Sequence, residues 1–194
     1  MQWLIVLMFF LLSVSSAKAD EGMEEWGKFA SGLATGFLTH EAGHQTVAWA
    51  NGTHLSWSLK NSDMTWFAEV EAKKGKRLRD VALGATAAEM ISSELILDSN
   101  ASKGSSYFIG WLSWNIITPW IYTLRDTAGG YGDLEAIRQN EHGLKVEYVI
   151  AAKLAHSLFT GCRLWNNKDF QESRIKFYIT PAHDSVMALV NIKF

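Results

Sequence analysis

The stretch Thr39-His40-Glu41-Ala42-Gly43-His44 sets two histidines four residues apart, with a glutamate directly after the first. On an α-helix, residues four apart lie on one face, about one turn from each other. Both imidazoles can therefore bind one metal ion, and the glutamate is then placed to polarise a water molecule on that ion. The alternative is a helix on which these three residues have no joint role.

The residues around this motif predict one long helix over 29–50, which ends at the turn signal Asn51-Gly52. Within this helix, and on to residue 59, the only formal charge is Glu41. Gly32 and Gly36 form a Gly-x-x-x-Gly pair, the spacing that lets another helix approach closely. The motif is therefore expected on a helix that packs tightly against a neighbour.

The flanking segments complete the predicted fold. Further helices are expected over 81–97, 104–124 and 146–159, and alternating residues predict β-hairpins over 54–70 and near the C-terminus. The segment 104–124 carries no charge for 21 residues, long enough to span a bilayer, and Pro119 is expected to kink or split it. We expect a mainly α fold: a membrane-associated helical bundle with a small β-hairpin after the first core helix and a short C-terminal β-hairpin.

The N-terminus has the pattern of an export signal. An apolar run from Leu4 to Val14 precedes Ala17-Lys18-Ala19, which fits the small-residue cleavage rule. The alternative is a retained membrane anchor. We predict a signal peptide over 1–19, a helical membrane-associated domain over 20–162 and a strand-rich tail over 163–194, delivered to a membrane that is predicted to be the bacterial inner membrane.

Composition limits the classes of function. A length of 194 residues fits one domain, and a net charge of -2 argues against a nucleic-acid partner. The single cysteine, Cys162, excludes an internal disulfide framework.

A catalytic zinc ion needs three protein ligands and one open position. His40 and His44 supply two, and the candidates for the third are Glu89, Glu94, Asp126 and Asp133. Glu89 and Glu94 are candidates because an acidic residue inside an apolar helix is costly unless it is paired or functional. We favour Asp133, which opens a helical run where a carboxylate is well placed, and Asp126 comes second.

The order of these features resembles the site-2-type intramembrane metalloproteases. The motif from His40 to His44 matches the family's His-Glu-x-Gly-His, and a hairpin, a basic pair and an Ala/Gly-rich helix follow it as in that family. Asn115 and Pro119 precede Asp126 and Asp133 in the family's order. The similarity covers residues 29–137, although the family's Asn-x-x-Pro-x-x-x-Asp-Gly motif is not intact here.

The motif and the resemblance together imply a membrane-associated zinc metalloprotease-like domain. Zinc is then held by His40, His44 and Asp133, and Glu41 is the general base for peptide-bond hydrolysis. The expected partners are a peptide or membrane-protein substrate and membrane lipid. The resemblance implies that Asn115 holds an extended substrate.

Three points stay open. Tyr122 and His142 are candidates to stabilise the oxyanion. An alternative substrate for the same site is an amide bond of a lipid or cell-wall molecule. The alternative from another class is a non-enzymatic integral membrane protein whose Gly-x-x-x-Gly helix packs against other helices or binds a partner.

Overall fold

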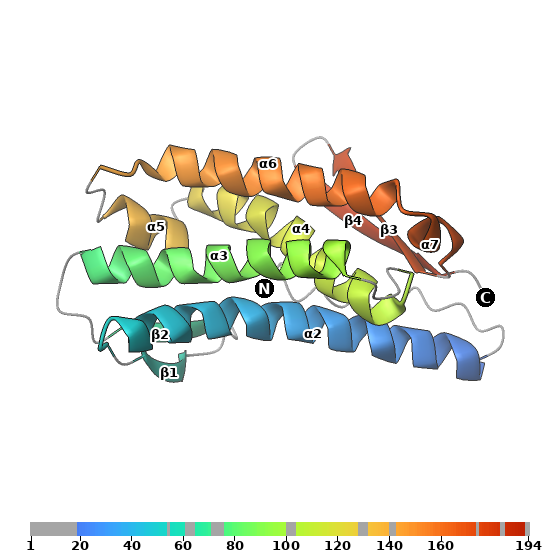
Figure 1. The fold of residues 1–194 in the computed structure, drawn as a ribbon, viewed down its shortest axis with the longest axis horizontal. Coiled ribbons are helices and arrows are strands. Elements are labelled where there is room, and N and C mark those ends of the chain that lie inside the picture. Colours follow the sequence, from blue (N-terminus) through green and yellow to red (C-terminus); the bar gives the residue numbers. More distant parts are fainter. Residues whose placement is uncertain are drawn as a thin grey trace.

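The computed structural model describes the main chain of residues 19–53, 55–60, 65–70, 76–99, 104–127, 132–139, 143–173, 175–182 and 185–192. It describes the side chains of residues 22–53, 55, 78–99, 104–124, 132–139 and 143–173. The predicted signal-peptide residues 1–18 and the candidate His142 lie outside these ranges. Elements carry the labels of Figure 1.

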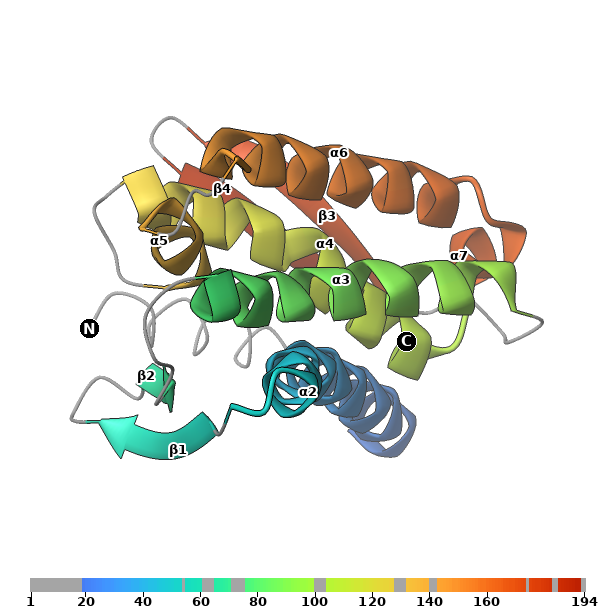
Figure 2. The ribbon, with the colours of Figure 1, turned by 60° about the vertical axis from the view of Figure 1, so that its left-hand side comes forward.

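Helices make up most of the described chain. The long ones are α2 (Ala19–Ala50), α3 (Lys76–Asp98), α4 (Ser106–Thr127) and α6 (Val146–Trp165), and the short ones are α5 (Asp133–Arg138) and α7 (Lys168–Glu172). Figures 1 and 2 show α2, α3 and α6 one above the next, with α4 alongside them and α5 at one end. Helix α4 runs through Pro119 as one helix, so this proline does not split it.

Helix α2 places its small residues against its neighbours. Its buried residues recur every three or four positions, at Phe29, Gly32, Gly36 and His40, so they form one stripe along the helix. A Cβ at Gly36 would come 2.6 Å from Cβ of Trp114 on α4. A Cβ at Gly32 would collide with α4 main chain. The Gly-x-x-x-Gly pair is therefore used inside this chain.

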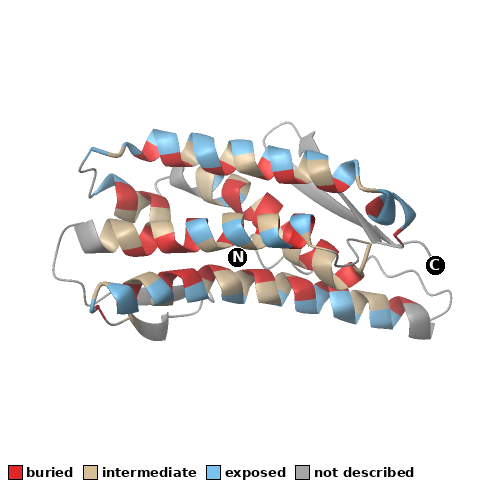
Figure 3. Cartoon of the chain, viewed as in Figure 1, coloured by how far each residue is buried: buried red, intermediate tan, exposed pale blue. Residues whose placement is uncertain are grey.

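Two apolar clusters hold the helices together, and Figure 3 shows buried residues on the sides of the helices that face one another. The larger cluster joins α2, α3, α4, α6 and α7 through Phe29, Ile96, Leu97, Ile109, Leu112, Ile116, Leu164 and Phe170. The smaller cluster holds α5 against α3 and α6 through Ala82, Leu134, Ile137, Val146 and Val149. Helix α6 ends at Trp165, beyond the residue where the C-terminal tail was predicted to begin.

The strands form two separate antiparallel pairs. Strand β1 (Leu55–Lys60) pairs with β2 (Thr65–Val70), and β3 (Ile175–Ala182) pairs with β4 (Ser185–Ile192). The first pair lies near the C-terminal end of α2, and the second lies beside α4. The buried side chains that the structure describes lie on helices, apart from Thr53, three residues beyond α2, and Ser173, next to α7.

The predicted fold class, a membrane-associated helical bundle, is wrong in its membrane-spanning helices and is corrected to a mainly α class, to which the two strand pairs are a small addition. Among the described residues, no helix has both the length and the apolar character needed to cross a bilayer. The reason is visible in α4, where absence of charge does not mean apolarity. Ser113, Asn115 and Thr118 are buried there and hydrogen-bond within the chain.

Candidate metal centre

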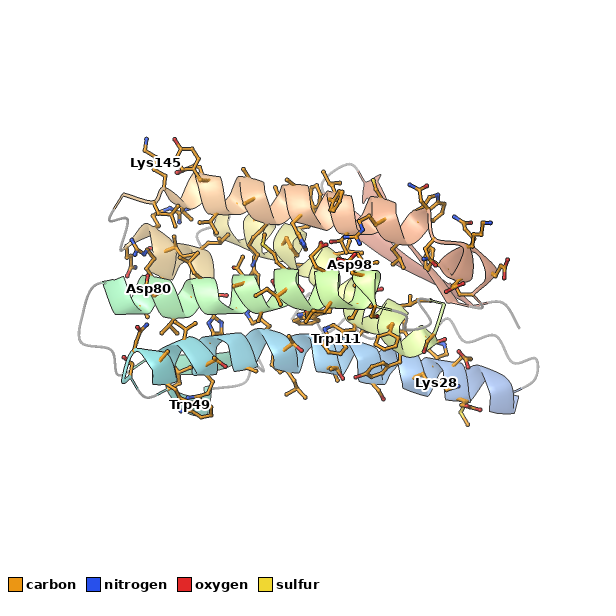
Figure 4. All side chains as sticks on the ribbon, viewed as in Figure 1. Lys28, Trp49, Asp80, Asp98, Trp111 and Lys145 are labelled. Atoms are coloured by element: carbon orange, nitrogen blue, oxygen red, sulfur yellow. The ribbon has the colours of Figure 1, made fainter. Side chains whose placement is uncertain are left out.

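The candidate site lies where five helices meet, with Tyr122 of α4 against His40. His40 and His44 lie in the second half of α2, Glu89 on α3, Asp133 at the start of α5, and Lys153 on α6. Figure 4 labels Trp49 and Asp80 near one end of α2 and α3, and Lys28 and Asp98 near the other ends, so the two helices run antiparallel.

Two histidines and one aspartate offer converging metal ligands. One ligand atom each from His40, His44 and Asp133 lies within 4.8 Å of the other two. Nε2 of His40 is 3.3 Å from Oδ2 of Asp133, and Nε2 of His44 is 3.3 Å from Oδ1 of the same carboxylate. The side chains of the histidines are 1% and 9% exposed, and that of Asp133 is 17% exposed. Two imidazole nitrogens and a carboxylate oxygen at these separations can hold a metal ion.

The other nitrogen of each imidazole has a fixed partner. Nδ1 of His44 is 2.8 Å from the Val81 carbonyl oxygen, which only accepts, so this nitrogen carries the proton. Nδ1 of His40 is 2.9 Å from Oε1 of Glu89 and donates to that carboxylate. In each neutral ring the lone pair is then at Nε2, on the side of Asp133. Such partners orient histidines that bind metals.

The contact between α2 and α3 that brings these partners together depends on two glycines. A Cβ at Gly43 would come 2.5 Å from the carbonyl oxygen of Gly84, and a Cβ at Gly84 would come 2.6 Å from the carbonyl oxygen of Gly43. Gly43 stands directly before His44, so the main chains of α2 and α3 touch beside the histidines. This approach is what places the Val81 carbonyl within hydrogen-bond distance.

Asp133 is held in place by the short helix that it begins. Leu134 and Ile137, one turn apart on α5, are buried in the smaller apolar cluster with Val146 of α6. Docking by these two side chains turns the carboxylate of Asp133 toward α2. A six-residue helix keeps its place through such tertiary packing and not through its intrinsic propensity.

Behind His40 lies a buried polar network that spans three helices. Oε2 of Glu89 is 3.4 Å from Nζ of Lys153, and both side chains are at most 4% exposed. Nδ2 of Asn115 on α4 lies 3.1 Å from the Glu89 carbonyl oxygen and 2.9 Å from Oγ of Ser93. Glu89 thus accepts from His40 with one oxygen and faces a cation with the other.

In the metal-free site, charged neighbours and burial shift the pKa values of the three candidate ligands in opposite directions. Burial lowers the pKa of His40, but hydrogen bonds with Asp133 and Glu89 outweigh it and raise the pKa to about 10. The pKa of His44 is also raised, because its bond to Asp133 outweighs burial. Burial would raise the pKa of Asp133, but hydrogen bonds from both histidines bring it far below its ordinary value.

Glu41 is half-buried next to these groups. Burial raises the pKa of its carboxyl group, and the nearby charges of His40 and His44 oppose that rise. A carboxylate whose pKa is raised toward neutrality is better matched to accepting and returning a proton.

Tyr122 of α4 contacts the buried ring of His40. Its ring stacks on the imidazole with centroids 5.5 Å apart and 25° between the planes. Its hydroxyl is 3.2 Å from Nε2 of His40. Nζ of Lys153 lies 5.1 Å from the centroid of the Tyr122 ring.

The structure separates the four sequence candidates for the third ligand. Asp133 faces both Nε2 atoms, whereas Glu89 lies on the Nδ1 side of His40. Glu94 pairs with His156 and Arg163 instead. The side chain of Asp126 lies outside the described residues. Asn115, expected to hold an extended substrate, is 3% exposed and hydrogen-bonds to α3.

Sequence reasoning missed Lys153. The available signal was its isolation, because it is the only charged residue between Glu147 and Arg163 on a helix.

No protein-family model matches the chain, and no curated protein or solved structure matches it either.

Proposed function

We propose that this chain is a zinc-dependent hydrolase that cleaves peptide bonds. The observation that carries the proposal is the convergence of His40, His44 and Asp133, with both Nδ1 atoms already hydrogen-bonded. Two histidines and one carboxylate form a common ligand set of catalytic zinc, which leaves one position open.

The residues divide the chemistry between them. A zinc ion held by His40, His44 and Asp133 would supply Lewis-acid activation of the attacking water. Glu41 takes a proton from the attacking water as its oxygen bonds to the peptide carbonyl carbon. As the carbon–nitrogen bond breaks, Glu41 returns that proton to the leaving amine. Glu89 and the Val81 carbonyl keep the two imidazoles oriented throughout.

The wider biological setting is part of the proposal and depends on sequence alone. The resemblance to site-2-type metalloproteases supports a peptide or membrane-protein substrate. The export pattern of residues 1–19 supports delivery to a membrane or beyond it. Cell fractionation of the full chain beside a chain lacking residues 1–19 tests that delivery.

The competing role, partner binding through the Gly-x-x-x-Gly pair, has less support. Gly32 and Gly36 both face α4 of the same chain, where Tyr107 and Trp114 occupy the space beside them. A second helix cannot use the same glycines without displacing α4.

Zinc content tests the site directly. We expect about one zinc ion per chain in wild type, and loss of most of it in His44→Ala and Asp133→Asn. His156→Ala is the matched control, because His156 pairs with Glu94 and lies outside the triad of His40, His44 and Asp133. Absence of zinc from wild type after purification with added metal, or equal retention in all variants, contradicts the proposal.

Hydrolysis tests the reaction. Glu41→Gln should keep the zinc and lose most cleavage of a peptide library, because the amide cannot take a proton. Cleavage by Glu41→Gln at the wild-type rate, with zinc bound in both, contradicts the role of Glu41.

A further inference from the structure

We propose that Tyr122 is a catalytic residue whose hydroxyl donates a hydrogen bond to the oxyanion that forms on the substrate carbonyl. This inference deepens the proposed hydrolase function and depends on it. The position of the hydroxyl carries the inference, because it lies 3.2 Å from the ligand nitrogen of His40, on the side that Asp133 also faces.

The first step concerns the lone pair of that nitrogen. Nδ1 of His40 donates to Glu89, so the neutral ring has one lone pair, at Nε2. A bound metal ion would take this lone pair, so the Tyr122 hydroxyl, 3.2 Å from Nε2, could not donate to that nitrogen. Its hydrogen can then be donated to an acceptor that lies beside the ligand nitrogen.

The second step concerns which acceptor is present there during the reaction. A peptide carbonyl that reacts beside the triad gains negative charge on its oxygen as the tetrahedral intermediate forms. A donor held beside this place stabilises that charge, which is how oxyanion-stabilising groups act. Of the two oxyanion candidates in the sequence, Tyr122 has its hydroxyl at the site, and His142 lies outside the described residues.

The third step concerns how Tyr122 is held. One face of its ring stacks on His40, with ring centroids 5.5 Å apart, and the ammonium of Lys153 lies 5.1 Å from its centroid. Leu134 and Val149 belong to the apolar cluster against which Tyr122 packs. These contacts involve the ring, which Tyr122→Phe retains, so this variant should keep the fold while it loses the hydroxyl donor.

A matched control exists on the same helix. Tyr107 of α4 also directs its hydroxyl at α2, where it donates to Oγ1 of Thr35 over 3.0 Å. Tyr107→Phe therefore removes the same atom from the same helix, four helical turns or more from Tyr122 along the chain. Tyr107→Phe and Tyr122→Phe share any general effect of losing a part-buried phenol hydroxyl, so a difference between them reports on the site.

The experiment compares wild type, Tyr122→Phe and Tyr107→Phe, each purified as the full chain and loaded with cobalt in place of zinc. The first measurement is metal content. The second is the affinity for methylphosphonate, a tetrahedral anion that imitates the reacting centre, followed by the visible absorption of cobalt. We expect equal metal content in all three, and methylphosphonate binding about tenfold to a hundredfold weaker in Tyr122→Phe alone.

Catalysis gives a second, separate measurement on a peptide that wild type cleaves. Tyr122→Phe should lower kcat by about a hundredfold to a thousandfold with little change in KM, because the bond forms only in the transition state. Equal methylphosphonate affinity and equal kcat in all three metal-loaded proteins overturn the inference on Tyr122 alone. Loss of metal from Tyr122→Phe but not from Tyr107→Phe also overturns it, since Tyr122 would then be a ligand. Wild type without metal overturns the proposed function itself.

Discussion

At the scale of single residues, the centre depends on what holds the far side of each imidazole. The Val81 carbonyl holds His44 and the Glu89 carboxylate holds His40, over 2.8 Å and 2.9 Å. The two supports differ in kind, because a carbonyl is neutral and a carboxylate is charged. Glu89 therefore makes the ligand nitrogen of His40 more basic as well as fixing its direction.

Replacing Glu89 by glutamine should weaken zinc binding without abolishing it. The amide oxygen can still accept from His40, but the charge is lost, so we expect about tenfold to a hundredfold weaker zinc affinity in a chelator competition titration. Glu94→Gln is the matched control on α3, because Glu94 pairs with His156 and Arg163. Full loss of zinc in Glu89→Gln with full retention in Asp133→Asn would show that Glu89 is the third ligand instead.

These residues show how far a sequence specifies a site. The position of His40 and His44 on one face follows from helix geometry and needs no other part of the chain. Helix geometry alone does not separate the roles of Asp133 and Glu89, although the place of Asp133 at a helix start favoured it as the ligand. Tertiary packing decides between them: α5 turns Asp133 toward Nε2, and α3 brings Glu89 to Nδ1.

At the scale of secondary-structure elements, contact between α2 and α3 at two glycines governs the centre. The main chains touch at Gly43 and Gly84, and this contact sets the distance from the histidines to both of their partners on α3. The sequence indicated that α2 would pack closely against a neighbour but not which one. Gly32 and Gly36 face α4, whereas Gly43 faces α3.

Gly43→Ala should force α2 and α3 apart. The new Cβ would come 2.5 Å from a main-chain oxygen and 2.8 Å from Cα of Ala85, and neither can rotate away. We expect a loss of about 1–3 kcal/mol in the free energy of unfolding by urea, together with weaker zinc binding. Gly27→Ala, on the same helix with no atom within 4 Å, should be neutral or stabilising. The same result for both glycines would contradict the importance of this contact.

At the scale of the whole molecule, one buried lysine connects the helical layers. Lys153 on α6 lies against Glu89 of α3 and the ring of Tyr122 of α4, each of which also contacts His40 of α2. Its helix was predicted from its apolar pattern, but this role could not be, since a lone lysine on a helix is ordinarily exposed. The contradicted membrane spans have a similar origin, because sequence shows absence of charge more readily than it shows buried polar pairs.

Lys153→Met should destabilise the fold although the two side chains are similar in volume. Removing Lys153 leaves Oε2 of Glu89 buried without its cation, since His40 contacts only Oε1, and we expect a cost of about 3–5 kcal/mol in the free energy of unfolding. Lys28→Met, which removes an exposed lysine paired with Glu24, should change stability little. Adding Glu89→Gln to Lys153→Met should restore part of the loss, and strictly additive losses in the double variant would refute the coupling.

The stability of the metal-free chain should fall as pH rises above neutrality. The pKa of His40 is raised from 6.5 to about 10, so its contribution to folding is fully present below pH 6.5 and is lost as pH rises through about 10. The raised pKa of His44 acts in the same direction. The lowered pKa of Asp133 gives a contribution that is present above pH 3.8 and is lost as pH falls, so it does not offset this decline.

Urea unfolding of chelator-treated protein at pH 6.5, 8 and 9.5 should therefore show a decreasing free energy of unfolding, and His40→Gln should flatten this dependence on pH. Zinc binds deprotonated imidazoles, so the stability that added zinc confers should increase over the same range. Metal-free stability that is constant or increases from pH 6.5 to 9.5 would mean that the triad does not hold its protons as the geometry requires.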